Sequence, residues 1–496
     1  MYLGIDFGTS YSKAALWDSG MNQPQFLLPR GKYGIPSVFY YDQDQGILIG
    51  EEAEDSGQGI DAENMKRAVK MDLSNDFTAD GRTFTSKEII TEIYKKVMAI
   101  AEKEASKGGY GSNVQGAVIS VPAKFTLQEI SLIENAAKDA GIHVTGVIKE
   151  PIAAALAYFK RYNRSFSDCA IIYDLGGGTC DIALIEHDED SKPEYEVIDS
   201  DMVRLGGKDW SACLTDYLAD DIEDQSGINV RSNISYMEKI SRAAEDVKRR
   251  LAEPDIEETK ARVEINGRIY KSEIDLNTFD RITKNLLKQT VDCLHKIYDD
   301  NCDDHDITDI ICVGGSSNMK QVLETIGDEF PDCDVSLVEP ERAVVYGDAI
   351  YADEMKGGST VSAKKFLRDI ASFSYGTDCL KVDGDSNGEK VVINLIQKGT
   401  SLPCNCSQRF FTVRDGQHGV SFDIYESDIK SEECSMVDAG NEPIGRMLLE
   451  LPPNTPADSE LRMTMKLDNG GMLYAEGRDS AGHKIHTTIN LNELKR

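Results

Sequence analysis

Two segments built alike, one at the start of the chain and one near its middle, constrain the fold more than any other feature. Residues 4–16 read GIDFGTSYSKAAL, and residues 173–185 read YDLGGGTCDIALI. In both, an apolar strand reaches an aspartate, a glycine-containing turn with a hydroxyl residue follows, and a second apolar strand leaves the turn. Backbone N–H groups in such a turn can point into one concavity, where a polyphosphate lies directly against the glycines. The triple glycine alone fits a tight hairpin with positive φ equally well, but the second copy favours two phosphate-binding hairpins in a duplicated α/β unit.

The rest of the chain predicts two domains of different class. Strand-like and helix-like segments alternate through the first part, as in AVISVPA at residues 117–123 and LQEISLIENAAKDAG at residues 127–141, which is typical of an α/β domain. The small, polar segment EMKGGSTVSA then indicates a linker. Beyond it, short alternating runs separated by Asp, Asn and Gly turns predict an all-β sandwich. We therefore expect an α/β domain over residues 1–353, a linker over 354–369 and a β-sandwich over 370–496.

Composition excludes several classes of partner. The chain of 496 residues carries 86 acidic against 54 basic residues, a formal charge of −32, which opposes binding to nucleic acid or to an anionic membrane. Its 11 cysteines show no repeated spacing, and its first residues enter a strand pattern without the basic and apolar regions of a signal peptide. No apolar run approaches the ~18 residues of a membrane helix. We expect a cytoplasmic protein in a reducing compartment that binds neither nucleic acid nor membrane.

Six motifs resemble the actin-like ATPase superfamily, and specifically the seventy-kilodalton heat-shock chaperones of the DnaK type. In chain order they are GIDFGTSYS, VISVPAKF, KEPIAAALAY, YDLGGGTCD, LGGKDW and ICVGGSS, at approximately the spacing of that family. The resemblance covers essentially the whole chain. It implies an actin-like, duplicated ATPase domain followed by a β-sandwich. It also implies a chaperone that binds extended apolar segments of unfolded client peptides under the control of ATP hydrolysis.

Carried over motif by motif, the resemblance implies a site for ATP and Mg²⁺ between the two hairpins. The implied nucleotide-binding residues are Asp6, Gly8, Thr9, Ser10, Tyr11, Gly176, Gly177, Gly178, Thr179, Asp181, Gly206, Gly207, Glu245, Lys248, Arg249, Gly314, Gly315 and Ser316. Asp6 and Asp174 would hold Mg²⁺ through its water molecules. The implied catalytic residues are Lys70, Glu150, Asp174 and Thr179. In a slow attack of water on the γ-phosphate, the lysine would offset charge and the others would position the water.

Two of the catalytic assignments have alternatives. Lys66 competes with Lys70 for the role of catalytic lysine, because the two lie four residues apart in NMKRAVKMDL. Glu150 stands directly before Pro151 and could instead be a carboxylate that the dipole at a helix N-terminus stabilises.

The residues implied to clasp ribose and adenine also have an alternative. Glu245, Lys248 and Arg249 lie in a charged run, and such runs are usually solvated helix faces. At the same end of the site, Ala252 stands where the family has a serine, and Asn318 stands where the family has an arginine that stacks on the base. Loss of a stacking cation should weaken nucleotide binding by about 1 kcal/mol.

In the β-sandwich, the resemblance implies a groove for one extended apolar peptide, held by backbone hydrogen bonds and a side-chain pocket. The implied peptide-binding residues are Leu380, Phe410, Val413, Gly419, Val420 and Phe422. The alternative is that they are core residues of the sandwich, which for Phe410 fits equally well. Because the sequence ends at NLNELKR, we expect no helical lid over the sandwich and therefore fast exchange of peptide.

Positions that couple the two domains in the family differ here. The linker reads KKFLRD, in which Lys365 and Arg368 interrupt the apolar run. Ile130 stands where the family has an arginine that acts with Pro122, and Gly146 stands where it has the arginine that meets a J-domain co-chaperone. These differences indicate altered coupling and an altered response to a J-domain protein. The resemblance also implies a nucleotide-exchange factor as a partner.

Other functions remain open at this point. One is a nucleotide-sensing module that recruits a client while its ATPase is vestigial or uncoupled, and another is an actin-like kinase or filament-forming ATPase. The sequence has no GxxxxGK[ST] motif, which excludes a P-loop enzyme. Two half metal sites, Cys302-x-x-His305 and Cys404-x-Cys406, lack a second ligand pair at finger-like spacing, and we interpret them as reduced thiols.

Overall fold

The chain divides into two compact units, each made of several stretches of sequence. The computed structural model describes residues 1–29, 31–57, 62–162, 169–187, 195–356, 367–381, 388–468 and 470–488. The first unit comprises Met1–Ala123, Leu132–Glu189 and Ser200–Ala363, and the second comprises Lys124–Ser131, Asp190–Asp199 and Lys364–Arg496. Most of the expected linker, including Lys365, lies outside the described residues.

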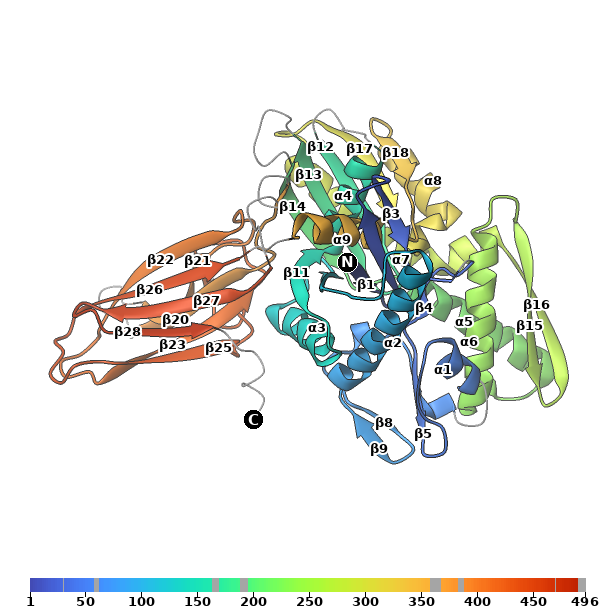
Figure 1. Ribbon diagram of the computed structural model, residues 1–496, viewed down its shortest axis with the longest axis horizontal. Helices are drawn as coiled ribbons and strands as arrows, with labels where there is room; N and C mark the ends of the chain where they lie inside the picture. Colours follow the sequence, from blue (N-terminus) through green and yellow to red (C-terminus); the bar gives the residue numbers. More distant parts are fainter. Residues whose placement is uncertain are drawn as a thin grey trace. The chain divides into compact units, whose positions relative to one another are not determined.

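The first unit is a mixed α/β structure built on two large sheets (Figure 1). One sheet has the strand order β11-β10-β1-β2-β3, with β4 paired to β2. Its strands are β1 (Tyr2–Phe7), β2 (Tyr11–Asp18), β3 (Gln23–Phe26), β4 (Ile35–Pro36), β10 (Gly116–Val121) and β11 (Val144–Lys149). The other sheet contains the order β18-β17-β12-β13-β14. Its strands are β12 (Cys169–Leu175), β13 (Cys180–His187), β14 (Tyr195–Val203), β17 (Ile307–Val313) and β18 (Asp334–Leu337).

The two sheets repeat one arrangement around a hairpin. β1 pairs in parallel with β10 and antiparallel with β2, and β12 pairs in parallel with β17 and antiparallel with β13. β10 and β12 are buried along their whole lengths. Strands covered on both faces have no polar side, which explains the nearly uninterrupted apolar sequence of both. The hairpins expected at residues 4–16 and 173–185 are therefore both present, at equivalent positions in the two sheets.

Helices cover these sheets, and in places they approach so closely that only glycine fits. The helices are α1 (Glu51–Ser56), α2 (Ser86–Lys107), α3 (Leu127–Asp139), α4 (Glu150–Tyr162), α5 (Gly207–Ser226), α6 (Ile234–Leu251), α7 (Leu276–Asn301), α8 (Lys320–Glu329) and α9 (Ala343–Glu354). A Cβ at Gly4 of β1 would overlap the backbone of α9, and a Cβ at Gly347 of α9 would overlap Ala153 of α4. The expected helix at residues 127–141 is α3, and the chain leaves it through Gly141 at φ +85°.

Smaller sheets complete the first unit. Their strands are β5 (Phe39–Asp42), β6 (Gly46–Ile49), β7 (Met65–Lys66), β8 (Phe77–Ala79), β9 (Arg82–Phe84), β15 (Glu258–Ile265) and β16 (Arg268–Asp275). The β15–β16 hairpin lies beside α5 and α6 (Figure 1). Among the described residues, no helix is both long enough and apolar enough to cross a membrane.

The second unit contains two antiparallel sheets, one of strand order β24-β21-β20-β23-β25 and one of order β22-β26-β27-β28. The strands are β20 (Ser374–Lys381), β21 (Glu389–Ile396), β22 (Cys404–Phe411), β23 (Gly419–Ser427), β24 (Glu433–Ser435), β25 (Gly445–Glu450), β26 (Glu460–Leu467), β27 (Leu473–Asp479) and β28 (Lys484–Thr488). Buried and exposed side chains alternate along β25, β26 and β27, as expected for sheets with one solvated face. The buried faces share one core, to which Phe422 and Met447 of the first sheet and Met463 and Met465 of the second belong. The all-β character expected beyond the linker is confirmed.

Candidate functional site

The two hairpin turns open into one cavity of about 440 Å³ in the first unit, next to the carboxyl ends of β1 and β12. Ligands of open α/β sheets bind at such strand ends. The expected nucleotide-binding and catalytic residues in its lining are Asp6, Gly8, Thr9, Ser10, Tyr11, Lys70, Glu150, Asp174, Gly176, Gly177, Thr179, Gly207, Glu245, Lys248, Arg249, Gly314, Gly315 and Ser316. Gly178, Asp181 and Gly206 lie outside the lining. A larger groove of about 690 Å³ between α6 and β15 contains none of these residues.

Close approach to other segments, and not an unusual backbone conformation, explains Gly177 and Gly178 of the triple glycine, because a Cβ at Gly178 would overlap the side chain of Met71 whereas one at Gly176 would meet only Thr179 O at 3.5 Å. None of Gly176, Gly177 and Gly178 has a φ in the positive region, so the alternative of a positive-φ turn is wrong. A Cβ at Gly177 would overlap the side chain of Ser10 in the other hairpin, and a Cβ at Gly206 would overlap the backbone of Gly177 and Gly178. The two hairpins therefore meet directly, and their turns are held at a fixed separation.

Buried charges crowd the end of the cavity that the two turns enclose. Asp6, Glu150 and Asp174 are all less than a tenth exposed, and Lys70 is equally buried. Lys70 Nζ forms an ion pair with Glu150 Oε1. A second lysine, Lys13, is partly buried and places its Nζ 2.9 Å from Asp6 Oδ2. Two lysines thus face a larger group of carboxylates in the same enclosed space.

Burial and nearby negative charge raise the pKa values of Glu150 and Asp174. Burial, with Lys70 opposing it and Asp181 and Asp6 adding to it, raises the pKa of Glu150 to about 7. Burial and the charge of Glu150 raise the pKa of Asp174 well above its usual range. Burial by itself would lower the pKa of Lys70, but the attraction of Glu150 and Asp6 outweighs it and raises that pKa. The lysine is therefore charged, but its attraction does not outweigh the effect of burial on Glu150 and Asp174, whose pKa values stay raised.

The structure separates the two candidate catalytic lysines. Lys70 lies in the 3₁₀ turn Val69–Met71, is buried, and lines the cavity beside Glu150. Lys66 lies on β7, outside the lining, and its Nζ pairs with Asp72 Oδ2 at 2.5 Å. This placement favours Lys70 as the lysine that meets a ligand in the cavity.

The opposite end of the cavity is formed by α6 and the turn after β17. Lys248 is buried, and its Nζ donates to Gly207 O and lies 2.8 Å from Glu245 Oε2. The interpretation of this run as a solvated helix face is therefore wrong for Lys248. The Ser316 hydroxyl donates to Gly176 O at 2.8 Å, which ties this turn to the second hairpin. Ala252 and Asn318, the two departures from the family, both line the cavity.

Several cavity residues escaped the sequence analysis. Lys13 is the most important, and its signal was available, because it lies as many residues after Asp6 as Asp181 lies after Asp174. Tyr33 gave no such signal. It lines the cavity from the loop before β4, and the guanidinium of Arg249 lies 5.1 Å from the centre of its ring. The further unexpected lining residues are Glu253, Pro254, Met319, Pro340, Glu341, Arg342 and Val344.

Five of the six expected peptide-binding residues fall into two groups in the second unit, and the sixth, Gly419, begins β23. Phe422 is buried, and its ring makes an edge contact with that of Phe410 at 6.0 Å between centres. Phe410 and Val420 pack partly buried against the same core, as the alternative reading proposed for Phe410. By contrast, Leu380 and Val413 are 53% and 61% exposed.

The strand pairing places Leu380 near one end of its sheet. β20 pairs antiparallel with β23, with Ser374 opposite Ser427 and Thr377 opposite Ile424. This direction carries Leu380, near the end of β20, toward the end of β23 that begins at Gly419.

Two of the positions that couple the domains in the family, Gly146 and Arg368, lie close to other side chains in the structure. A Cβ at Gly146 of β11 would lie 3.3 Å from the ring of Tyr351, so a long side chain there needs the neighbour to move. Arg368 of β19 (Leu367–Arg368) lies 3.3 Å from Glu196 of β14, with which it also pairs in the sheet. The arginine that interrupts the apolar linker is therefore engaged in an ion pair.

Comparison with known proteins agrees with this architecture. A family model described as Hsp70 protein matches residues 60–495. The chain is 28% identical to the Chaperone protein DnaK of Halobacterium salinarum (strain ATCC 29341 / DSM 671 / R1) over an alignment that covers 98% of this chain and 74% of the relative. The match to the family model spans well over half of the sequence. The chain therefore belongs to the Hsp70 family of ATP-dependent, ATP-hydrolysing molecular chaperones.

Proposed function

We propose that this Hsp70-family protein binds ATP in the cavity between the two hairpins, where water attacks the γ-phosphate. The observation that carries this proposal is that both glycine-containing turns meet the buried Lys70–Glu150 pair in one cavity. The phosphates would lie against the two turns, and the ribose and base would lie toward α6, where Lys248 and Glu245 form a fixed pair.

Each charged residue at the phosphate end has a proposed role. Lys70 offsets the negative charge that develops on the γ-phosphate in the transition state. Glu150, Asp174 and Thr179 hold the attacking water in line. The pKa of Glu150, raised to about 7 by burial, suits proton exchange with water near neutral pH.

The same end fits a magnesium ion, which neutralises charge on the β- and γ-phosphates when bound. Mg²⁺ prefers oxygen ligands and keeps several of its waters, so Asp6 and Asp174 would hold it through water molecules. The raised pKa of Asp174, which comes from burial and then from the nearby carboxylates Glu150 and Asp181, supports this fit. A divalent cation beside them relieves that repulsion.

We further propose that the first unit has the duplicated actin-like fold, with an ATPase domain over residues 1–353, a linker over 354–369 and a peptide-binding β-sandwich over 370–496. The hairpin repeated in both large sheets supports the duplication. The two compact units follow these boundaries in part, because residues 124–131 and 190–199 group with the second unit.

In the β-sandwich, we propose that an extended apolar client segment contacts the exposed side chains of Leu380 and Val413, next to Gly419. Phe410, Val420 and Phe422 would support this surface from the core.

Binding of a labelled apolar peptide, measured by fluorescence anisotropy, tests whether the exposed side chains contact the peptide. Leu380→Asp and Val413→Asp should each weaken binding at least several-fold. Val437→Asp is the matched control, since Val437 is 74% exposed and was not assigned to the groove.

The proposed partners are unfolded client peptides and a nucleotide-exchange factor, with a J-domain protein meeting an altered surface at Gly146. The 11 cysteines show no repeated spacing in the sequence, which supports a reducing, cytoplasmic compartment.

A second candidate function is a nucleotide-sensing module that recruits a client without coupled hydrolysis. The packed surroundings of Gly146 and the ion pair of Arg368 favour this second function.

ATP turnover with and without an extended apolar peptide, measured also for Thr179→Ala, separates the coupled chaperone from the nucleotide sensor. Turnover that rises with peptide and falls in Thr179→Ala supports the coupled chaperone. Tight ATP binding without turnover, or turnover that ignores peptide, supports the sensor.

A further inference from the structure

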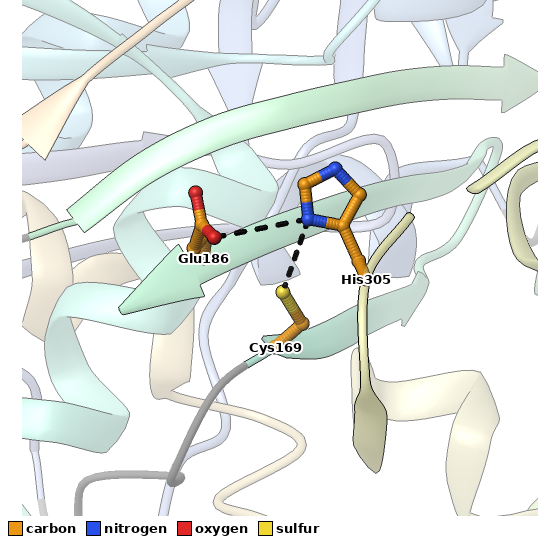
Figure 2. Close-up of side chains that lie close together, drawn as sticks. All are labelled: Cys169, Glu186 and His305. Carbon is orange, nitrogen blue, oxygen red and sulfur yellow. Dashed lines mark hydrogen bonds and ion pairs between the residues drawn. The ribbon is translucent and has the colours of Figure 1, made fainter. Parts of the chain in front are cut away.

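Three side chains with metal-binding donor atoms converge at the end of the second large sheet that lies away from the nucleotide cavity. Cys169 begins β12, Glu186 is the last residue but one of β13, and His305 stands two residues before β17. Cys169 pairs with Glu186 on one side and with Ile307 on the other. Since residues directly opposite share one face of a sheet, the Cys169 and Glu186 side chains lie on the same face, and His305 approaches them from the bend before β17. Figure 2 shows them pointing toward one another.

The spacing of the three donor atoms is close to that of metal ligands. His305 Nδ1 lies 3.7 Å from Cys169 Sγ and 3.8 Å from Glu186 Oε1, and the three donor atoms all lie within 4.8 Å of one another. A nitrogen-to-oxygen separation of 3.8 Å is too long for a hydrogen bond. Around a tetrahedral zinc ion, ligand sulfur and nitrogen lie about 3.6 Å apart, and nitrogen and oxygen about 3.4 Å. Small side-chain movements therefore bring all three to coordination distance.

Protons account for only one of the two contacts at this ring nitrogen when the ring is neutral. Both dashed contacts in Figure 2 end at Nδ1 of His305. Nδ1 can accept a hydrogen bond from the Cys169 thiol at 3.7 Å, while Glu186, at 3.8 Å, lies beyond hydrogen-bond reach of the same nitrogen. A catalytic relay is also excluded as an explanation, because a relay uses one ring nitrogen for the nucleophile and the other for the carboxylate. A cation among the three atoms accepts a lone pair from each of them.

We propose that Cys169, Glu186 and His305 bind one Zn²⁺ ion, with a water molecule as fourth ligand. The thiol loses its proton to solvent on binding, so sulfur coordinates as thiolate. Thiolate together with imidazole selects zinc over Mg²⁺ or Ca²⁺, which prefer oxygen ligands alone. The Glu186 side chain is 45% exposed and that of His305 21%, which leaves a solvent side for the ion and its water.

The position of the site predicts a structural role. The strands that carry its ligands, β12, β13 and β17, lead at their other ends into the second phosphate turn and the turn at Gly314–Ser316. Five residues of β12 separate Cys169 from Asp174, a span of about 17 Å for an extended strand. Zinc would therefore clamp three strands without touching the nucleotide, and its loss should lower thermal stability more than nucleotide binding.

Cobalt substitution in the full chain tests the proposal directly. After treatment with a chelator, one equivalent of Co²⁺ should produce a thiolate-to-cobalt charge-transfer band and the visible bands of a tetrahedral site, and Zn²⁺ should displace them. Cys169→Ser and His305→Ala should abolish the bands and lower zinc affinity at least about 100-fold. Cys302→Ser is the matched control, because Cys302 is exposed and its Sγ lies near Asp299 O instead. If Cys169→Ser does not fold, Glu186→Gln at the exposed edge gives the same comparison.

Thermal melting in Zn²⁺ supplies a second readout. Excess Zn²⁺ should raise the Tm of the unmodified chain and of Cys302→Ser, and should leave the ligand variants unchanged. Absence of cobalt bands and of a Tm shift in the unmodified chain would overturn the proposal, leaving an ordinary polar cluster. Bands that survive in both Cys169→Ser and His305→Ala would also overturn it, because the metal would then sit at other thiols.

Discussion

The two hairpins that border the cavity share one plan but differ in charge at one position. In the β1–β2 hairpin, the last residue but one of the first strand is Asp6, and Lys13 stands opposite it in the ladder. In the β12–β13 hairpin, the corresponding residue is Asp174, and Asp181 stands opposite it. The first hairpin therefore carries its own counter-ion, with 2.9 Å between Lys13 Nζ and Asp6 Oδ2, while the second places two buried carboxylates face to face.

This difference decides which hairpin needs a bound cation to balance its carboxylates. Burial, only partly opposed by hydrogen bonds from Thr179 and the Ala123 amide, raises the pKa of Asp181 to about 6. Burial and neighbouring carboxylates raise the pKa of Asp174 as well. A buried carboxylate pair becomes stable by taking up a proton or a cation. We therefore expect the contribution of the second hairpin to nucleotide binding to depend on Mg²⁺. The contribution of the first hairpin should not depend on Mg²⁺.

The largest expected effect concerns Lys70, the cation that both hairpins share. It pairs with Glu150 and is attracted by Asp6 of one hairpin and Asp181 of the other. Lys70→Ala should lower single-turnover phosphate release about 10²- to 10³-fold, as expected when one group that stabilises transition-state charge is removed. Lys66→Ala, four residues away and paired with Asp72, should change it less than about two-fold, as for other partly exposed ion pairs. Equal losses in both variants would mean that Lys70 has no special place between the hairpins.

The second prediction separates the hairpins from each other. Lys13→Met should weaken binding of a fluorescent nucleotide in EDTA about 10- to 100-fold, because it removes a charge-assisted contact and leaves Asp6 unpaired. In saturating Mg²⁺ the loss should be smaller. Lys32→Met is the control, since Lys32 pairs with Glu51 at the surface.

A substitution in the second hairpin tests the same difference in charge from the other side. Asp181→Asn removes the like charge opposite Asp174, so nucleotide binding in EDTA should become stronger and its dependence on Mg²⁺ weaker. If Lys13→Met and Asp181→Asn shifted Mg²⁺ dependence in the same direction, the difference in charge between the hairpins would not control it.

The two hairpins also show which parts of the site could be predicted from the sequence and which could not. The hairpins and most of the cavity lining were predictable, because each motif is contiguous and close approach requires glycine at positions such as Gly177, which lies against Ser10. The charge difference also had a signal in the sequence, since Lys13 follows Asp6 at the spacing at which Asp181 follows Asp174, but the pairing of Lys13 with Asp6 depends on strand register, which the whole sheet sets. Likewise, Lys66 and Lys70 lie four residues apart, and only the fold shows which one turns inward.

Contacts between distant segments were beyond any local pattern. Tyr33 reaches Arg249 from more than two hundred residues away, and Cys169 meets His305, whereas the sequence pattern placed only Cys302 near that histidine and we interpreted Cys302 as a reduced thiol. The exposed and buried groups of the expected peptide-binding residues could not be separated either, since burial on a strand depends on the sheet that packs against it.

The third prediction tests the direct contact between the hairpins. Gly177→Ala places a Cβ against the Ser10 side chain and should cost about 1–3 kcal/mol of stability, as overpacking does, with a loss of nucleotide affinity of about ten-fold. Gly176→Ala is a matched control one residue away, because its Cβ would meet only Thr179 O at an ordinary 3.5 Å. Thermal melting and nucleotide titration of both variants provide the measurement. Equal effects would show that the glycines act through chain flexibility and not through this contact.

The smallest predicted effect is a change in how stability depends on pH. The pKa of Glu150 is about 7 in the folded chain against an ordinary value of 4.5, so its protonated form favours folding. The stabilisation is complete below pH 4.5 and is lost as the pH rises through 7, an effect on the order of 3 kcal/mol at most. The Tm of the nucleotide-free chain should therefore fall between pH 5 and 8 by a few degrees more than that of Glu150→Gln.

Glu245, at the other end of the cavity, gives a control of opposite sign. Burial acts to raise the pKa of Glu245, but Lys248 and the Ser211 hydroxyl outweigh it and hold that pKa below its usual range. Glu245 therefore contributes stability at pH values above its ordinary pKa, and this stability is lost as the pH falls. Glu245→Gln should remove it.

Because Glu150 belongs to the carboxylate-rich side of the site, saturating Mg²⁺ and nucleotide should flatten the pH dependence of the unmodified chain. Parallel melting profiles for the unmodified chain and Glu150→Gln would show that Lys70 alone neutralises this carboxylate, and that the excess negative charge lies only on Asp174 and Asp181.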